Sequence, residues 1–288
     1  MSEIKLGFIG FGEAADCICR GLLGEGVTGI SAFDVRPRST PDGVDMAESL
    51  EAMLGQSDVV FAAVTSAVAL DVANEAAPHL SERHLYVDIN SVSPETKIRI
   101  GEVISATGAR YVEAAVMAGV PAYGHKVPML LAGKAATDLI ALMAPLGMVM
   151  EDFGPELGRA AAAKMFRSVM VKGMEALFQE CVLGAERYGV AERVLESIGD
   201  GYPGIDWNEL ANHLIGRTAL HGERRAHEME EAAETLKSMG IEPLMSEAAA
   251  KRIAWAASFG LKEKFAGKAP ESYGEVLEII DSPDKKES

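Results

Sequence analysis

The sequence contains few cysteines, few cationic residues and no long uninterrupted apolar run. Three cysteines in 288 residues do not make a disulfide framework, which favours a reducing compartment, so we expect a cytoplasmic protein. Lysine and arginine total 27 against 43 aspartates and glutamates, and the net charge of −16 repels phosphate backbones and anionic membrane surfaces. The composition therefore argues against nucleic acid or a membrane as a partner. A small anionic substrate would need a local cationic pocket.

The most apolar stretch of the chain, Ala160–Phe178, is interrupted by charge. It contains four charged residues, Lys164, Arg167, Lys172 and Glu175. Because these side chains would lie in hydrocarbon if the stretch crossed a membrane, we predict a buried helix of a globular protein instead. The first residues, with Glu3 before a short apolar run that ends in glycines, do not resemble a secretory signal, so no export is expected.

Up to about residue 150, short β-rich runs alternate with segments of helical periodicity. The predicted strands are Ile4–Ile9, Ile30–Phe33, Val59–Val64, Leu85–Ile89, Tyr111–Ala114, Met129–Ala132 and Met148–Met150. Helical segments such as Ala14–Leu23 and Pro94–Ala106 lie between them. This alternation predicts an α/β Rossmann fold, a doubly wound parallel sheet with helices on both faces.

Beyond Gly154-Pro155 the pattern changes to long helical segments without a convincing strand. The predicted helices are Leu157–Tyr188, Trp207–Gly216, Leu220–Ser238 and Ser246–Ser258. We therefore predict a Rossmann domain over residues 1–155 and an all-α domain over residues 156–288, joined by a long helix. The charged tail from about residue 281 has no apolar period and is expected to be mobile.

A glycine-rich turn follows the first predicted strand. Its residues are Gly10, Phe11, Gly12, Glu13, Ala14 and Ala15, a G-x-G-x-x-A pattern that runs into a helix. Gly10 permits the tight turn, Gly12 leaves room for a pyrophosphate, and Ala15 lets the helix pack closely on the strand. The phosphates of a dinucleotide would sit at the helix N-terminus, where N–H groups favour anions. Taken alone, the pattern also fits a glycine-rich turn in an unrelated α/β protein.

The second predicted strand ends at Asp34. A carboxylate at this position can accept hydrogen bonds from both ribose hydroxyls of NAD, and its negative charge disfavours the 2′-phosphate of NADP. Arg36 and Arg38 follow and could tolerate that phosphate. NAD is therefore the preferred cofactor, with NADP possible. A further loop at the cofactor edge is expected after the third strand, at Val64, Thr65 and Ser66. The alternative for this loop is an ordinary polar turn.

Four ordered blocks of the chain resemble the 3-hydroxyacid dehydrogenase / 6-phosphogluconate dehydrogenase superfamily, and more narrowly its small branch with a short, distinctive helical C-terminal domain. The blocks are Gly7–Leu22, Asp88–Pro94, Glu113–Gly133 and Lys164–Glu180. The resemblance implies a Rossmann domain joined by a long helix to a helical domain that usually forms a homodimer. It also implies an active site in the cleft between the domains and a lysine as general acid/base.

Lys164 falls at the position of that lysine. Its apolar surroundings in the sequence would lower the pKa of the amine by desolvation, which suits proton exchange with a substrate hydroxyl. Ser168 and Lys172 follow at steps of four, so the three side chains share one helical face and are candidate substrate contacts. The alternative is that Lys164 and Lys172 extend to solvent or pair with acids such as Glu175.

By the same resemblance, Asn90 and Ser91 lie near the nicotinamide and the substrate, while Ser93 before a proline is a typical helix N-cap. Gly119 belongs to the substrate-binding block. Many relatives carry a serine before paired glycines in that block, which holds the substrate carboxylate, whereas this chain has Met117. One expected carboxylate donor is therefore missing.

A second departure is Ser168, which replaces the family asparagine one turn after the catalytic lysine. The helical domain also contains His221, Arg224 and Arg225 on one face, and Arg225 in particular could bind the anionic group that Met117 cannot. The alternative is that this cluster is solvated surface.

Together these features predict an NAD(P)-dependent oxidoreductase that oxidises the hydroxyl of a small 3-hydroxy acid, or reduces the corresponding oxo acid. One alternative is an imine reductase on the same fold, although relatives with that activity usually lack the lysine. Another is a non-catalytic dinucleotide-binding sensor or interaction protein. The sequence has no histidine pair with zinc spacing and no G-x-S-x-G elbow, so metal-dependent hydrolysis and nucleophilic catalysis are not supported.

Overall fold

The computed structural model describes residues 4–36 and 39–281, and the chain divides into two compact units, Met1–Lys164 and Met165–Ser288. The division lies beyond the predicted boundary at residue 155, because the first turns of the long helix are bonded to the first unit through Glu113. Arg38, with its predicted cofactor contact, and the predicted mobile tail after Asp281 lie outside the described residues.

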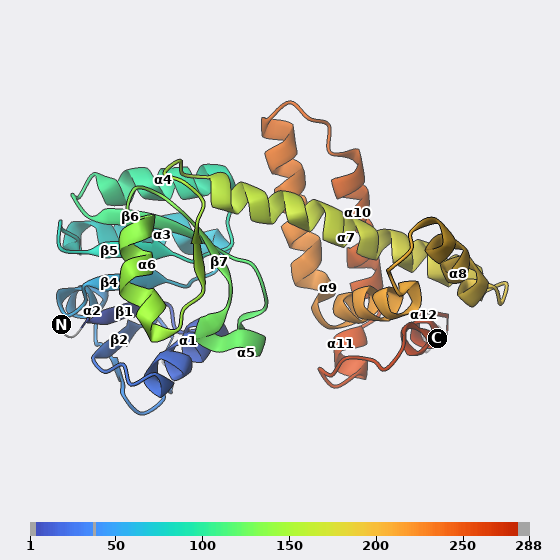
Figure 1. The fold of residues 1–288 in the computed structure, drawn as a ribbon, viewed down its shortest axis with the longest axis horizontal. Helices are drawn as coiled ribbons and strands as arrows, with labels where there is room; N and C mark the ends of the chain where they lie inside the picture. Colours follow the sequence, from blue (N-terminus) through green and yellow to red (C-terminus); the bar gives the residue numbers. More distant parts are fainter. Residues whose placement is uncertain (1–3, 37–38, 282–288) are drawn as a thin grey trace, which may run out of the picture. The chain divides into compact units, whose positions relative to one another are not determined.

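The described part of the first unit contains one sheet with the strand order β3-β2-β1-β4-β5-β6-β7-β8 (Figure 1). Its strands are β1 (Leu6–Ile9), β2 (Ile30–Phe33), β3 (Val44–Met46), β4 (Val59–Ala62), β5 (Leu85–Asp88), β6 (Arg110–Val116), β7 (Met129–Ala132) and β8 (Met150–Asp152). β1 pairs in parallel with both β2 and β4, so the chain winds outward from β1 in two directions. The predicted doubly wound α/β class is confirmed.

Helices cover both faces of this sheet, and each face has its own apolar core (Figure 1). The helices of the first unit are α1 (Glu13–Gly24), α2 (Leu50–Gly55), α3 (Ala69–Ala76), α4 (Pro94–Ser105), α5 (Val120–Tyr123) and α6 (Ala136–Met143). The core beneath α1 and α6 contains the stacked rings of Phe8 and Phe61, with centroids 5.2 Å apart. The opposite core, beneath α2, α3 and α4, contains Tyr86 and Tyr111.

The last strand, predicted at Met148–Met150, lies at Met150–Asp152, and two further features of the sheet differ from the prediction. β3 has only three residues, too few to show a strand period in the sequence. β7 is antiparallel to β6, because the chain turns back through α5 and Met129 pairs with Val116 at the end where β6 finishes. The Met117 N–H donates to the Pro128 carbonyl and closes this return.

The described part of the second unit is helical, as predicted. Its elements are α7 (Arg159–Glu186), which begins in the first unit, and α8 (Ala191–Gly201), α9 (Trp207–Ser238), α10 (Leu244–Ala257), α11 (Leu261–Lys264) and α12 (Tyr273–Asp281). α9 and α10 run side by side (Figure 1). Within residues 4–36 and 39–281, no helix combines the length and the apolar character that a membrane crossing requires.

α9 joins two segments that the sequence pattern predicts as separate helices. The helix continues through the junction, but His221 has non-helical angles, φ −131° and ψ 17°. The neighbouring Gly222 lies so close to α10 that an added Cβ would be 2.8 Å from the Cβ of Ala257. We attribute the kink to this close approach, since a glycine at a contact weakens the helix locally.

Candidate active site

The predicted dinucleotide turn joins β1 to α1. Gly10 has φ +83°, and a Cβ there would lie 2.6 Å from the Ala63 carbonyl oxygen, so only glycine fits. Gly12 is the N-cap residue of α1, and a Cβ there would meet no protein atom within 4 Å. Ala15 is fully buried, as expected for the residue that packs α1 on the sheet, while Glu13 and Ala14 form the first turn. The turn therefore leaves open space above Gly12, at a helix N-terminus.

Asp34 ties the end of β2 to this turn. Its Oδ2 accepts a hydrogen bond from the Phe11 N–H at 2.8 Å, and its Oδ1 accepts one from the Arg36 N–H, also at 2.8 Å. A carboxylate has about four acceptor sites in all, so it can accept bonds from a ribose hydroxyl in addition to those from the backbone. The carboxylate thus lies beside the glycine turn, where the sequence pattern predicts the ribose.

These residues fit a nicotinamide dinucleotide. The N-terminus of α1 offers N–H groups to a pyrophosphate, the space above Gly12 lets the phosphates approach the backbone, and Asp34 offers acceptors to a ribose. Phe11 is buried and holds the turn against the core of the sheet. The dinucleotide site predicted from the G-x-G-x-x-A pattern is therefore sterically and electrostatically possible.

Replacing Gly12 with alanine is expected to weaken NAD binding by about ten-fold or more, equivalent to about 1.4 kcal/mol, without unfolding the protein. The added methyl group meets no protein atom within 4 Å but occupies the space that a pyrophosphate needs. Gly24→Ala is the matched control, because Gly24 lies at the other end of α1 and is equally unobstructed. Isothermal titration calorimetry with NAD measures both variants, and wild-type affinity in Gly12→Ala would place the phosphates elsewhere.

The loops after β4 and β5 meet through Asn90. Its Oδ1 accepts a hydrogen bond from the Val64 N–H at 2.7 Å, whereas its buried Nδ2 has no hydrogen-bond partner among the described residues. Thr65 follows Val64 in the loop and Ser66 begins a short 3-10 helix, Ser66–Val68; both side chains are exposed. Because β1, β4 and β5 are neighbours in the sheet, their carboxyl ends share one edge, the usual ligand edge of such sheets. The unpaired amide of Asn90 is a donor available to a ligand at that edge.

A buried polar network lies beneath Asn90. The Lys97 ammonium, 1% exposed, donates to the Asp88 carbonyl at 2.7 Å and lies 3.0 Å from the Oδ1 atom of the Asp88 carboxylate. The Tyr111 hydroxyl donates to the other carboxylate oxygen at 3.1 Å, and the Asn90 N–H donates to Oδ1 at 2.9 Å. The network therefore holds the backbone that presents Asn90.

The sequence interpretation missed this network, although a signal for it exists. Lys97 falls on the same face of α4 as Ile100 and Ile104, which are both fully buried. A lysine on an apolar helical face indicates a buried partner, because an unpaired buried charge is costly. The predicted N-cap of α4 is confirmed, since the Ser93 hydroxyl accepts a hydrogen bond from the Thr96 N–H at 3.2 Å.

Lys164 lies at this same edge. Its ammonium donates to the Ser91 hydroxyl oxygen at 2.7 Å, which joins α7 to the loop after β5 across 73 positions of sequence. Lys164 is partly buried and Ser91 is exposed. Two of the predicted site residues, one a candidate acid/base and the other a candidate substrate contact, are therefore in direct contact within the first unit.

Glu113 determines where α7 begins. Its carboxylate is fully buried and accepts hydrogen bonds from the Gly158 N–H at 2.5 Å and the Ala161 N–H at 2.6 Å. Burial raises the pKa of Glu113, and the two backbone bonds oppose this shift. A carboxylate at a helix N-terminus satisfies N–H groups that have no partner within the helix. Glu113 thereby positions the turn of α7 before Lys164, a role that the sequence interpretation missed despite the charge within an apolar strand.

The residues of the predicted substrate-binding block, Gly119 and Met117, make fewer polar contacts than Lys164 and Asn90. Gly119 is the N-cap residue of α5, and a Cβ there would meet no protein atom within 4 Å. Met117, at the position where the resemblance predicts a serine, packs against the small apolar cluster of Ala115, Ala132 and Ala160. Its thioether is therefore used for packing and replaces no hydrogen bond of a serine.

The remaining predicted contacts belong to the second unit. Ser168 is partly buried. Lys172 is buried and its ammonium lies 2.6 Å from a Glu228 carboxylate oxygen, and burial lowers the pKa of Lys172. Arg225 is buried and donates two hydrogen bonds to Glu175. Both cations thus have carboxylate partners inside the protein, in agreement with the alternative considered for Lys172.

Comparison with protein families matches residues 5–150 to the NAD binding domain of 6-phosphogluconate dehydrogenase. Residues 185–256 match a domain of unknown function, DUF1932. The first match covers β1 to β7 and the first residue of β8, and hence the glycine turn, Asp34 and Asn90. The second covers α8, α9 and most of α10.

Among solved structures, a conserved hypothetical protein from Sinorhizobium meliloti 1021 is 39% identical, with a TM-score of 0.80 and 96% of each chain covered. The conserved protein MTH1747, described as structurally similar to 3-hydroxyacid dehydrogenases, is 32% identical, with a TM-score of 0.75, over 92% of this chain and 100% of its own. The 2-(hydroxymethyl)glutarate dehydrogenase of Eubacterium barkeri is 26% identical over 68% of this chain and 69% of that protein. The fold is thus that of the 3-hydroxyacid dehydrogenases.

Proposed function

Because this chain belongs to the family built on the NAD binding domain of 6-phosphogluconate dehydrogenase, we propose that it is a nicotinamide-dependent dehydrogenase of small 3-hydroxy acids. It would oxidise the hydroxyl group or reduce the corresponding oxo acid. The observation that carries the proposal is the 2.7 Å contact between the Lys164 ammonium and Ser91. This contact lies at the strand edge that also carries the G-x-G-x-x-A turn. The name of the relative from E. barkeri agrees with this substrate class.

We propose NAD as the preferred cofactor. The turn from Gly10 to Ala15 and the N-terminus of α1 would hold the pyrophosphate, and Asp34 would hold the ribose. When bound, the nicotinamide supplies hydride chemistry that no side chain can perform. The Asp34 carboxylate would repel a 2′-phosphate, while the exposed Arg36 beside it leaves NADP possible. Val64, Thr65 and Ser66 would border the cofactor.

We propose that Lys164 is the general acid/base. As a neutral amine, its Nζ atom would accept the proton of the substrate hydroxyl during oxidation, and as the ammonium it would return that proton during reduction. Ser91 would orient the amine through the existing hydrogen bond, and the unpaired Nδ2 of Asn90 would donate to the cofactor or substrate. Glu113 is a positioning residue, because it holds the first turn of α7. Gly119 and Ser168 stay proposed substrate contacts.

The direct test is reduction of NAD in the presence of a panel of 3-hydroxy acids, followed by absorbance of the reduced nicotinamide. We expect turnover with at least one short 3-hydroxy acid, and slower turnover with NADP, because Asp34 disfavours the additional phosphate. A matched panel of 2-hydroxy acids controls for unspecific oxidation. If no hydroxy acid supports reduction while NAD still binds, the alternative of a non-catalytic dinucleotide-binding protein would replace the proposal. Imine substrates with NADPH test the second alternative.

The assembly and the location are predictions from the sequence and its resemblance. We propose a homodimer formed through the helical region of residues 156–288, and a cytoplasmic location. Size-exclusion chromatography with light scattering at several protein concentrations measures the mass in solution.

A further inference from the structure

A group of basic side chains in the second unit contains only one member, Arg224, that has an acidic partner among the described residues. It consists of Arg167 on α7 and of Arg217, His221 and Arg224 on α9, and we refer to it as the basic cluster. Arg217 is partly buried, and within the described residues its guanidinium has neither a hydrogen bond nor an ion pair. Its nitrogens are not among the buried polar atoms that lack a partner, so they keep access to solvent and can donate to a ligand.

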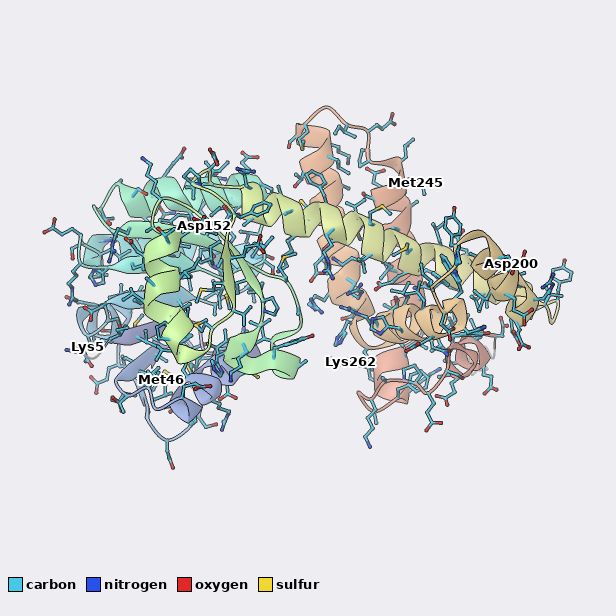
Figure 2. The ribbon with its side chains drawn as sticks, viewed as in Figure 1. Lys5, Met46, Asp152, Asp200, Met245 and Lys262 are labelled. Carbon is cyan, nitrogen blue, oxygen red and sulfur yellow. The ribbon has the colours of Figure 1, made fainter. Side chains whose placement is uncertain are left out.

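The surroundings of the cluster are cationic. Burial lowers the pKa of Arg217, and the nearby charges of Arg225, Arg224 and Arg167 lower it further against the opposing effect of Glu175. Burial also lowers the pKa of His221, and the positive charges of Arg224, Arg217, Arg225 and Lys262 lower it further. Lys262, on α11, is labelled in Figure 2. Charges that oppose protonation of both groups indicate a positive local potential.

The carboxylates of Glu175 and Glu228 already have cationic partners. Glu175 accepts both hydrogen bonds of the Arg225 guanidinium. Glu228 lies 2.6 Å from the Lys172 ammonium through one oxygen and 2.5 Å from the Arg224 guanidinium through the other. Arg217 therefore receives no carboxylate of its own from this network. The chain as a whole has a net charge of −16, so a region with excess positive charge is unusual for its surface. Such a region indicates an anionic ligand.

We propose that the basic cluster is a binding site for a small oxyanion, a carboxylate or a phosphate group, with Arg217 as its principal ligand. The planar guanidinium offers paired donors that match both kinds of oxyanion. Partial burial strengthens the attraction, because less water screens the charge. Arg167 and His221 are exposed and have neither a hydrogen bond nor an ion pair within residues 4–36 and 39–281, so they can add donors at its rim. The sequence predicted Arg225 as the anion-binding residue, but the Arg225 guanidinium is hydrogen-bonded to Glu175. We therefore assign the anion-binding role to Arg217.

The test is titration of the full chain with inorganic phosphate and, separately, with propionate, at constant ionic strength set by sodium chloride. The arginine Nε–Hε signals in NMR spectra follow binding. We expect at least one anion to cause a saturable shift of these signals. The anion that binds with the higher affinity identifies the site as one for phosphate or for carboxylate. Arg217→Gln should bind that anion about ten-fold more weakly or worse, the loss of a charge-assisted hydrogen bond.

Two variants make the result decisive. Arg193→Gln is the matched control, because it removes the same charge from an exposed arginine of α8 and should leave the dissociation constant within about two-fold of wild type. Arg217→Lys keeps the charge, and if Arg217→Gln does not fold, weaker binding in Arg217→Lys tests the role of the paired donors. Absence of a saturable change in wild type, or wild-type affinity in the Arg217 variants, would overturn the inference. The anion titration does not test the proposed role of Lys164, because replacing Lys164 should leave anion binding at the basic cluster unchanged.

Discussion

Replacing Lys164 with methionine is expected to lower turnover by about a thousand-fold, within the roughly 10²–10⁴-fold contribution of a positioned general acid/base. The NAD affinity should change little, because the glycine turn and Asp34 are not altered. Methionine keeps much of the aliphatic volume of the side chain but cannot exchange a proton. The measurement is the rate of nicotinamide reduction with the best 3-hydroxy acid of the panel, together with calorimetric titration of NAD.

The matched control for this prediction is Lys134→Met. Lys134 is an exposed lysine of the same unit, so the variant removes an equal charge away from Ser91. It should retain wild-type turnover. Full activity of Lys164→Met would exclude the lysine from proton transfer, whatever the other residues of the site do.

Replacing Lys97 with methionine is expected to destabilise the first unit by about 3–5 kcal/mol, because it leaves the fully buried Asp88 carboxylate without its cation. The double variant Lys97→Met with Asp88→Asn should be more stable than Lys97→Met alone. It removes the stranded charge, its amide oxygen can still accept from the Asn90 N–H, and its NH2 group can donate to the Tyr111 hydroxyl oxygen. Urea unfolding followed by far-ultraviolet circular dichroism measures these differences.

Lys126→Met is the comparison on the surface of the same unit. Lys126 pairs with Glu25 at 3.0 Å, and both side chains are substantially exposed, so its loss should have a much smaller effect. Both tryptophans, Trp207 and Trp255, lie in the second unit, and their fluorescence reports separately on that unit. A Lys97→Met variant no less stable than Lys126→Met would contradict the stabilising role of the buried Lys97–Asp88 pair.

The structural elements that the sequence predicts correctly are those that a few adjacent residues determine. The turn from Gly10 to Ala15 and the N-cap at Ser93 depend on backbone conformations within a few residues, and both are where the pattern indicates. The direction of β7 was not predictable in the same way. It depends on pairing between Val116 and Met129 after an irregular connection, and an apolar run carries no direction.

The residues of the candidate site show the same difference between local and long-range information. The identity of Lys164 as a candidate came from its block of sequence, but its contact with Ser91 joins positions 73 residues apart. The Glu113 carboxylate and the N–H of Ala161 are separated by 48 residues. The pairing of these residues cannot be recognised from their neighbours in the chain, because only the fold brings the two partners together.

The sequence alone determined the order of strand, glycine turn, helix and acidic strand end, because each of these depends on steric and hydrogen-bonding preferences of adjacent residues. Only the tertiary structure decided which charges have partners. Lys97 is buried against Asp88 and Arg225 against Glu175, whereas Arg217 has no ion pair within the described residues. The physical reason is that the free energy of a charge depends on its burial and on the groups across from it, and those groups come from distant parts of the chain.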